Sequence, residues 1–404
     1  MTRPVPLTIW IGFPAPYQND LLEALEATGR VDLHVVFARH LPADRLELGW
    51  KARLGSYRHR FLSDGDALSL AARLAWRQRH RVHVVNGIWM EAPFAVALST
   101  LAGAGSRYLI FSESPDARAP RPLPLRITRR ALGTAIARAA TGALAVSHFA
   151  LDYYRALGVP ERGLYPFGYF CRGADREAVA PHRRPDRLEV LYLGQLVHRK
   201  GLDLLLEAIR PLLRQSARLH LAIAGAGPER AELERRVAEV GLAGRVRLEG
   251  PVASHEVLGR IAAADLLALP SRWDGWGIVV NEALSVGVPV LISDRCGAMD
   301  LVRQGVNGYV HTSESVASLR ANLEAFVRLG PAERLHMRQA ALQTGEQLRV
   351  RRAAEYLIDC VEHALKRRAM PPAIPWLEAR ASRTRRQSRP DRHPACAGPS
   401  APAP

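Results

Sequence analysis

The stretch from Pro270 to Asp294 combines residue types that suit a phosphorylated sugar. Two glycines, Gly275 and Gly277, precede a helix-like run, and glycine lets the backbone approach a ligand closely. The first N–H groups of a helix have no partner within it, so they suit an anion such as a diphosphate. Asp274 lies before this helix and Glu282 about one turn inside it, where carboxylates would accept hydrogen bonds from sugar hydroxyls. Together these features favour a nucleotide sugar as ligand.

This segment resembles the donor-binding signature of retaining GT-B glycosyltransferases of family 4, the glycosyl transferases group 1. Relatives usually carry Glu, seven residues and Glu, whereas this chain has Asp274, seven residues and Glu282. In the family the first acid and the following backbone amides contact the donor sugar, and the second acid holds the ribose. The resemblance therefore implies donor contacts from both acids and from Gly275, Trp276, Gly277 and Ile278. The alternative is an ordinary helix N-cap at Asp274 and a solvated Glu282.

A second match lies in the loop 194–201, which follows a predicted strand. Relatives have Gly-Arg-Leu at its start and Lys-Gly later, with Arg and Lys on the donor phosphates. Here Gly194 and Lys200 keep their places, Gln195 replaces the arginine, and we expect Arg199 to supply the missing guanidinium. Lysine acts on phosphate as a point charge, while arginine can bind two oxygens at once. The alternative for Lys200 is a surface lysine.

The first half of the chain offers two further candidates. Gly12 ends the first predicted strand in a turn where relatives often have glycine, so the resemblance implies contact with the donor. Glu113 ends another strand, at a place where many relatives hold a polar residue, often His, against the donor sugar. Its alternative is a helix-start acid favoured by the helix dipole. The Gly-Val-Asp element of relatives is replaced by Phe-Gly-Tyr-Phe-Cys at 167–171, so the sequence does not specify the acceptor.

Predicted strands and helices alternate along the chain, which is typical of parallel sheets with helices on both faces. The resemblance covers roughly residues 7 to 365. We therefore expect an α/β protein of GT-B architecture, with two doubly wound, Rossmann-like domains facing each other across a cleft. The expected parts are an N-terminal acceptor-side domain (1–173), a linker (174–187), a C-terminal nucleotide-sugar domain (188–345), a helix crossing back to the first domain (346–366) and a disordered basic, Pro-rich tail (367–404).

Composition limits the cellular setting. The four cysteines lie far apart without a Cys-x-x-Cys pair, which argues against a zinc site or a disulfide framework and fits a reducing compartment. No signal peptide is evident, and no apolar run approaches the ~20 residues of a membrane span. These features predict a cytoplasmic protein.

The net charge of +17 points to an anionic partner. The stretch from Pro115 to Arg138 is rich in arginine, with Leu125, Leu132 and Ile136 spaced for one face of a helix. Such a helix can lie on an anionic membrane, so peripheral contact with the cytoplasmic leaflet is a hypothesis. The alternative is an amphipathic domain helix with a solvated basic face.

The resemblance implies transfer of a hexosyl unit from a UDP- or GDP-sugar, with retention, to a glycan or lipid-linked saccharide. Lys200 and Arg199 would stabilise the departing diphosphate, and Asp274 and Glu113 complete the expected catalytic set. No Asp-x-Asp motif stands in a suitable place, so neither a metal nor another cofactor is expected. The changes at Asp274 and Gln195 leave a non-catalytic GT-B-like partner subunit as an alternative. A charge-driven nucleic-acid-binding protein is a third hypothesis, but it leaves the glycine turn unexplained, so no nucleic-acid partner is expected.

Overall fold

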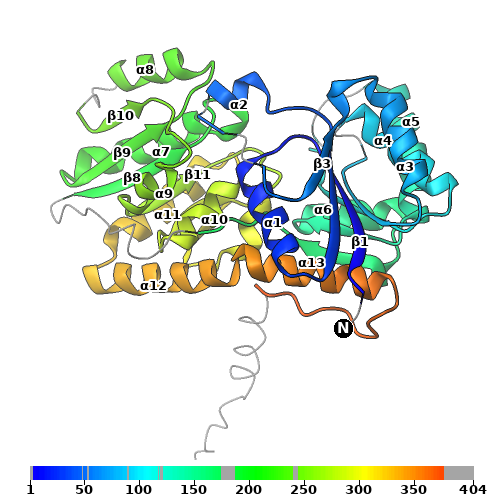
Figure 1. The fold of residues 1–404 in the computed structure, drawn as a ribbon. Helices are drawn as coiled ribbons and strands as arrows, with labels where there is room; N and C mark the ends of the chain where they lie inside the picture. The colour runs from blue at the N-terminus through cyan, green and yellow to red at the C-terminus, as the bar shows by residue number, and fades with distance from the viewer. Residues whose placement is uncertain are drawn as a thin grey trace, which may run out of the picture.

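The computed structural model describes residues 3–47, 49–51, 54–88, 91–116, 118, 122–173, 187–239 and 244–376, which form two α/β domains (Figure 1). The first domain contains a seven-stranded parallel sheet with the order β3-β2-β1-β4-β5-β6-β7. Its strands are β1 (Val5–Ile11), β2 (Val31–Phe37), β3 (Arg58–Phe61), β4 (Val82–Asn86), β5 (Tyr108–Glu113), β6 (Gly142–Val146) and β7 (Leu164–Phe167).

The second domain contains a six-stranded parallel sheet with the order β10-β9-β8-β11-β12-β13. Its strands are β8 (Leu188–Leu193), β9 (Leu219–Ala224), β10 (Val246–Glu249), β11 (Leu266–Leu269), β12 (Val290–Ser293) and β13 (Gly308–His311).

Both sheets are wound in two directions from their first strand. The order reverses between β1 and β4 and again between β8 and β11, and ligands of such sheets bind outside the carboxyl ends of the strands at this switch point. Every residue of β4, β6, β11 and β12 is buried, as sheets covered on both faces require. The predicted pair of doubly wound parallel-sheet domains is therefore confirmed.

Helices cover both sheets. In the first domain they are α1 (Pro16–Ala27), α2 (Ala43–Glu47), α3 (Ala67–Arg77), α4 (Ala92–Gly103), α5 (Leu123–Ala139) and α6 (His148–Leu157). In the second they are α7 (Leu202–Gln215), α8 (Arg230–Glu239), α9 (Val257–Ala262), α10 (Ile278–Ser285), α11 (Val316–Arg328) and α12 (Pro331–Gln347). Within the described ranges, no helix is long and apolar enough to cross a bilayer.

The final helix, α13 (Val350–Ala364), continues the line of α12 and runs beneath the first domain (Figure 1). The Tyr356 hydroxyl donates to the carbonyl of Pro166 at 3.0 Å, and the Tyr165 hydroxyl lies 2.7 Å from Nδ1 of His363. The helix expected at 346–366 thus lies against the first domain and ties the two domains together.

The chain packs further toward its C-terminus than the sequence predicted. Residues 367–376 follow α13, and the Trp376 ring lies 5.4 Å from that of Phe170 and 5.6 Å from that of Tyr356. The expectation that the disordered tail begins at 367 is therefore wrong for this segment, because Trp376 packs against the rings of Phe170 and Tyr356. Residues 174–186 of the predicted linker and 377–404 of the predicted tail lie outside the described residues.

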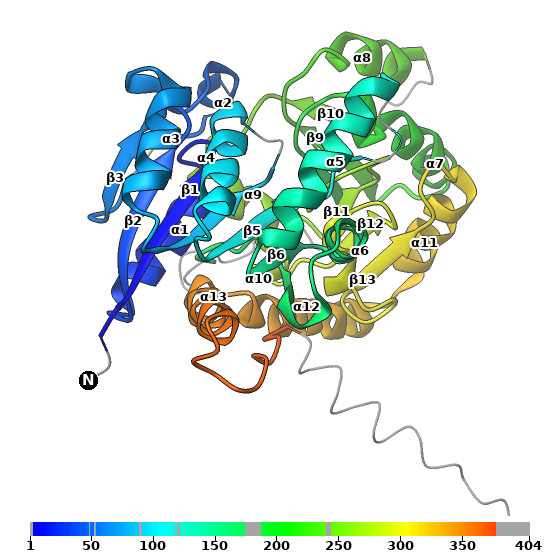
Figure 2. The same ribbon diagram turned by 90° about the vertical axis from the view of Figure 1, so that its right-hand side faces the viewer.

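Helix α5 packs differently from the prediction. Its inward face is formed near its end, where Ile136 is only 2% exposed, whereas Leu125 and Leu132 are 42% and 38% exposed. The expected single apolar face with Leu125, Leu132 and Ile136 is therefore wrong, because only the last turns of α5 reach the domain core. Figure 2 shows α3 and α4 side by side on the outside of the first domain, and α5 contacts α4. Residues 117 and 119–121, which precede the helix, lie outside the described part.

Candidate active site

A pocket of about 270 Å³ lies between the two domains, at the carboxyl ends of their strands. It brings together most of the residues singled out in the sequence. The predicted residues that line it are Glu113, Gly194, Gln195, Arg199, Lys200, Asp274, Trp276, Gly277, Ile278 and Glu282. Gly12 and Gly275 are not among its lining residues; Gly12 lies beside Glu91, while Gly275 lies directly against the Glu113 carboxylate.

The turn before α10 is shaped by Gly277. This residue has φ +88°, in the left-handed region that favours glycine, and forms the N-cap of the helix. A Cβ atom at this position would lie 2.8 Å from the Cys296 sulfur and 2.9 Å from a Leu269 methyl group. The turn therefore carries Ile278 and the following backbone N–H groups to the pocket wall, where the positive end of the helix dipole suits an anion.

Two basic side chains face this helix end from the loop after β8. The Lys200 ammonium forms an ion pair with the Asp274 carboxylate, and both side chains are about one-tenth exposed. The Arg199 guanidinium lies 3.5 Å from the amide oxygen of Gln195 and 3.4 Å from the carbonyl oxygen of Trp273. Gln195, which replaces the relatives' arginine, therefore contacts Arg199, the residue expected to compensate for it.

Glu282 projects from α10 into the same pocket. Burial raises the pKa of its carboxyl to about 7, so the group is near half ionised at neutral pH. Hydrogen bonds from hydroxyl groups of a ligand would favour the charged form and lower this pKa. Such a group is suited to accept hydrogen bonds from a sugar.

Glu113 enters the pocket from the end of β5 in the first domain. Burial and the neighbouring Asp274 carboxylate raise the pKa of Glu113 to about 7, while the Tyr169 hydroxyl hydrogen-bonds to it. The helix-start interpretation of Glu113 does not fit, because the carboxylate contacts the second domain at Gly275 rather than a local helix.

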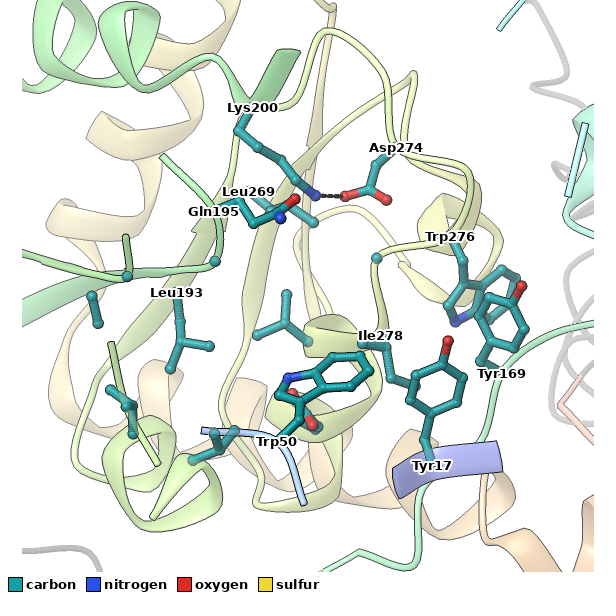
Figure 3. A pocket seen from close by; sticks show the side chains of 18 of the residues that line it. Tyr17, Trp50, Tyr169, Leu193, Gln195, Lys200, Leu269, Asp274, Trp276 and Ile278 are labelled. Atoms are coloured by element: carbon teal, nitrogen blue, oxygen red, sulfur yellow. Dashed lines mark hydrogen bonds and ion pairs between the residues drawn. The ribbon is translucent and has the colours of Figure 1, made fainter. Parts of the chain in front are cut away.

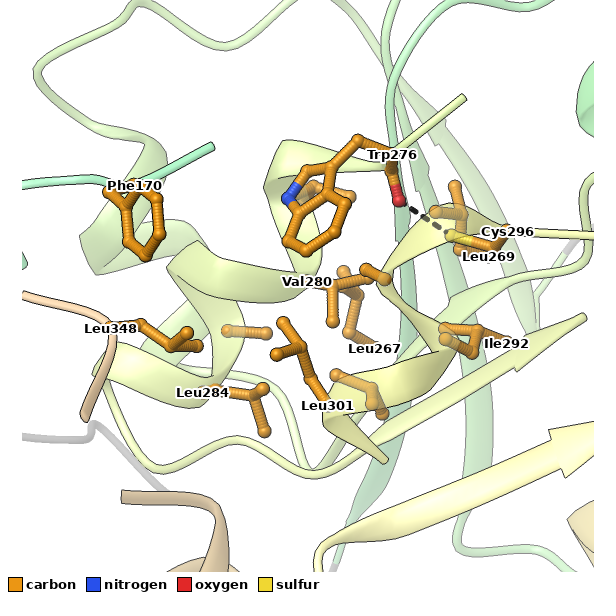
Figure 4. Packing of buried hydrophobic residues seen from close by; sticks show 14 of the residues in the cluster. Phe170, Leu267, Leu269, Trp276, Val280, Leu284, Ile292, Cys296, Leu301 and Leu348 are labelled. Atoms are coloured by element: carbon orange, nitrogen blue, oxygen red, sulfur yellow. Dashed lines mark hydrogen bonds between the residues drawn. The ribbon is translucent and has the colours of Figure 1, made fainter. Parts of the chain in front are cut away.

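Trp276 anchors the turn rather than projecting into solvent. Its ring is 2% exposed and lies over Gly168, where a Cβ atom would be 2.6 Å from the ring. The indole Nε1 donates to Asn281 at 2.8 Å, and the Asn281 amide donates to the Tyr169 carbonyl at 2.8 Å. Figure 4 shows the ring above the apolar residues packed beneath α10. The tryptophan therefore joins the turn before α10 to the first domain.

Of the five lining residues that the first domain contributes, the sequence analysis missed four: Tyr17, Arg45, Trp50 and Tyr169. The Tyr17 ring lies 5.1 Å from Tyr169 and 6.2 Å from Trp50, and the Arg45 guanidinium lies 5.2 Å from the Trp50 ring. The rings of Tyr17, Trp50 and Tyr169 form an aromatic wall across the pocket from Lys200 (Figure 3). The sequence did hold one signal for these residues. They lie in segments that follow strands of the first sheet, and ligands of such sheets bind at the carboxyl ends of the strands.

Comparison with solved structures defines the class of fold. A structure of the Anabaena protein HepE in complex with UDP and glucose has a TM-score of 0.65 at 17% identity, covering 88% of this chain and 99% of that protein. Sucrose-phosphate synthase from Thermosynechococcus elongatus has a TM-score of 0.66 at 19% identity, covering 89% and 99%. With its two facing parallel-sheet domains, this protein has the GT-B fold.

Sequence comparisons point to a family within this class. Residues 175–344 match the model of the glycosyl transferases group 1. Alpha-D-kanosaminyltransferase of Streptomyces kanamyceticus is 28% identical over 57% of this chain, and the GDP-mannose-dependent alpha-(1-6)-phosphatidylinositol monomannoside mannosyltransferase of Mycobacterium tuberculosis is 32% identical over 38%. The matched segments cover 63% and 43% of these relatives, less than two thirds of either. The comparisons therefore relate the second domain of this chain to the glycosyl transferases group 1.

Proposed function

We propose that this protein is a retaining glycosyltransferase of the family 4 type, which transfers a hexosyl unit from a UDP- or GDP-sugar to a saccharide acceptor. The observation that carries the proposal is the convergence of Lys200, Arg199, Glu282 and the start of α10 on one pocket between the domains. Cationic side chains and a helix N-terminus suit a diphosphate, and a carboxylate suits a ribose. The second domain is the donor side, and the first is the acceptor side.

The basic loop stabilises the leaving group in this proposal. When the bond between the sugar C1 and the phosphate oxygen breaks, negative charge grows on the diphosphate. Lys200, Arg199 and the α10 N–H groups are positioned to offset that charge, so they stabilise the transition state more than the bound donor. Asp274 and Glu113 would hold the hydroxyl or other polar groups of the sugar.

Retention follows a same-face route in this mechanism. The acceptor oxygen bonds to C1 on the face that the diphosphate leaves, and the acceptor proton passes to the departing phosphate oxygen. The protein then supplies orientation and electrostatic stabilisation, while the substrate itself takes the proton. No protein nucleophile is required.

The test is a ligand screen followed by product analysis. A ligand of the native state raises thermal stability, so nucleotide diphosphate sugars should shift Tm and unrelated nucleotides should not. Slow hydrolysis of the bound donor should release free sugar, whose anomer observed by NMR reports retention or inversion. A protein that binds donors but never cleaves them, with or without acceptors, would favour a non-catalytic subunit.

A second feature concerns a membrane-borne acceptor. Leu123 and Ile127 on α5 are 64% and 61% exposed, and arginines are interleaved with them on the same helix. Exposed apolar side chains beside basic ones suit the interface of an anionic bilayer, where each basic residue near the surface contributes about 1 kcal/mol. This arrangement favours peripheral contact on the acceptor side and a lipid-linked saccharide as acceptor.

Vesicle sedimentation tests this contact. The full chain should sediment with anionic vesicles and dissociate from them in high salt. It should not sediment with neutral vesicles. Glutamine at three of the four α5 arginines should weaken sedimentation more than deletion of residues 367–404 does. The reverse ranking would place the contact on the tail, and free protein throughout would indicate a soluble acceptor. The substituted arginines are Arg126, Arg129 and Arg130.

A further inference from the structure

The Glu113 carboxylate lies against the turn before α10 and forms no ion pair within the described ranges. A Cβ atom at Gly275 would lie 1.7 Å from Oε2 of Glu113, so this glycine allows the acid to touch the backbone beside Asp274. Asp274 is paired with Lys200, whereas the described part of the chain gives Glu113 no ion-pair partner. Its polar neighbour is the hydroxyl of Tyr169.

Donor binding would make this end of the pocket more negative. Under the proposed function, Lys200 turns from Asp274 to the diphosphate, which leaves two carboxylates facing each other where the sugar lies. Like charges in a buried site are unfavourable unless a proton or a cation lies between them. The basic residues that remain, Arg199 and Arg45, lie on the loop toward the diphosphate and on the aromatic wall.

We infer that the pocket selects a donor whose sugar carries a primary amine, held as an ammonium between Glu113 and Asp274. This inference rests on the proposed function and concerns the same pocket. An ammonium donates three hydrogen bonds and offsets both acids at once, which a hydroxyl group cannot do. A carboxylate next to the amine also favours its charged form.

The ionisation of Glu113 supports this arrangement. The pKa of about 7 results first from burial and then from Asp274. An ammonium would lower that pKa, so an amino sugar should displace a proton from Glu113 when it binds just below pH 7. The other charged or titratable groups that act on Glu113 are Lys200, Arg199, Tyr169, Tyr17 and Cys296.

The experiment compares matched donors on the full chain. UDP- and GDP-hexoses are titrated calorimetrically beside analogues in which one hydroxyl, at each ring position in turn, is replaced by an amine. At one position the amine should improve affinity about tenfold or more, because hydrogen bonds to charged groups are the stronger class. Glu113→Gln should abolish that preference, and Glu207→Gln, which changes an exposed acid on α7, should keep it.

A second measurement does not depend on the variant. Titrations of wild-type protein in buffers of different ionisation enthalpy should show greater proton release with the amino sugar than with its hydroxyl counterpart, because both donors displace the Glu282 proton and the amine also displaces that of Glu113. Equal affinity for both donors, equal proton release, or a preference that survives Glu113→Gln would overturn the inference while leaving the proposed function intact. If no nucleotide sugar of either kind binds, the proposed function itself fails.

Discussion

Replacing Glu282 by glutamine should stabilise the protein above neutral pH while weakening its hold on the nucleotide. The pKa of Glu282 is about 7 in the folded protein, against 4.5 for an ordinary glutamate. The folded state therefore binds its proton more tightly than the unfolded chain does. This raised pKa costs nothing below about pH 4.5, costs more as pH rises toward 7, and costs its full amount above 7.

The two pKa values are 2.5 pH units apart, and each unit corresponds to ~1.4 kcal/mol, which gives an upper bound of ~3.4 kcal/mol. Glu282 lies at a pocket that solvent enters, so a gain of about 1–2 kcal/mol is the realistic expectation. The amide should also lose about 1–2 kcal/mol of nucleotide affinity, because a hydrogen bond to a neutral acceptor is weaker than one to a charged acceptor. Stability and binding should thus change in opposite directions.

Urea unfolding of wild type and Glu282→Gln at pH 4.5 and pH 8 measures the first effect. Calorimetric titration with UDP and GDP measures the loss of nucleotide affinity. Because these ligands carry no donor sugar, Glu113 does not contribute to the measured difference. The stability difference should appear at the higher pH and vanish at the lower one. A variant that is less stable at both pH values, or that binds nucleotide as tightly as wild type, would refute the role of Glu282 as a buried ribose acceptor.

Three other substitutions test the rest of the pocket. Lys200→Ala should lower kcat by about 10²–10³ with a smaller change in the donor KM, since diphosphate charge grows in the transition state; unchanged kcat in steady-state assays rejects the role. Arg199→Ala should lower kcat less, and adding Gln195→Arg should recover part of the loss. An unchanged kcat in Arg199→Ala would contradict the hypothesis that Arg199 replaces the arginine missing at position 195. Gly275→Ala should displace Glu113 and cost about 1–3 kcal/mol of donor affinity, measured by calorimetry; normal affinity would show that the turn can shift.

The half of the pocket formed by the second domain was predictable because its features are local. Gly277 forms a helix start, and Asp274 and Glu282 flank it, so spacing along the chain is enough to place them in one site. Lys200 joins them because the carboxyl ends of neighbouring parallel strands meet at the same sheet edge. The apolar runs likewise predicted most strands of the two sheets, of which β4, β6, β11 and β12 are buried throughout.

The missed parts depend on contacts between distant segments. Helix α12 has an indistinct apolar face, since Met337 and Ala341 are among its few buried residues, so no periodicity indicated it. Trp50 follows a short helix and reaches the pocket only because Gly49 packs against Ala253 of the second domain, where a Cβ atom would be 3.2 Å away. No spacing rule connects these positions.

Under the proposed function, Lys200 exchanges one anionic partner for another when the donor binds. Lys200 is paired with Asp274 in the protein alone, so a diphosphate must replace one carboxylate by another anion instead of meeting a free lysine. Separating Lys200 from Asp274 costs part of the Coulomb energy that Lys200 gains from the diphosphate. The affinity of the protein for the bound donor is therefore lower than a free lysine would give. Under the proposed function, the released Asp274 would face the sugar beside Glu113, which would couple phosphate binding to sugar recognition. A nucleotide without its sugar would leave that acid without a partner, so the pocket should discriminate intact donors from spent nucleotide and favour product release after transfer.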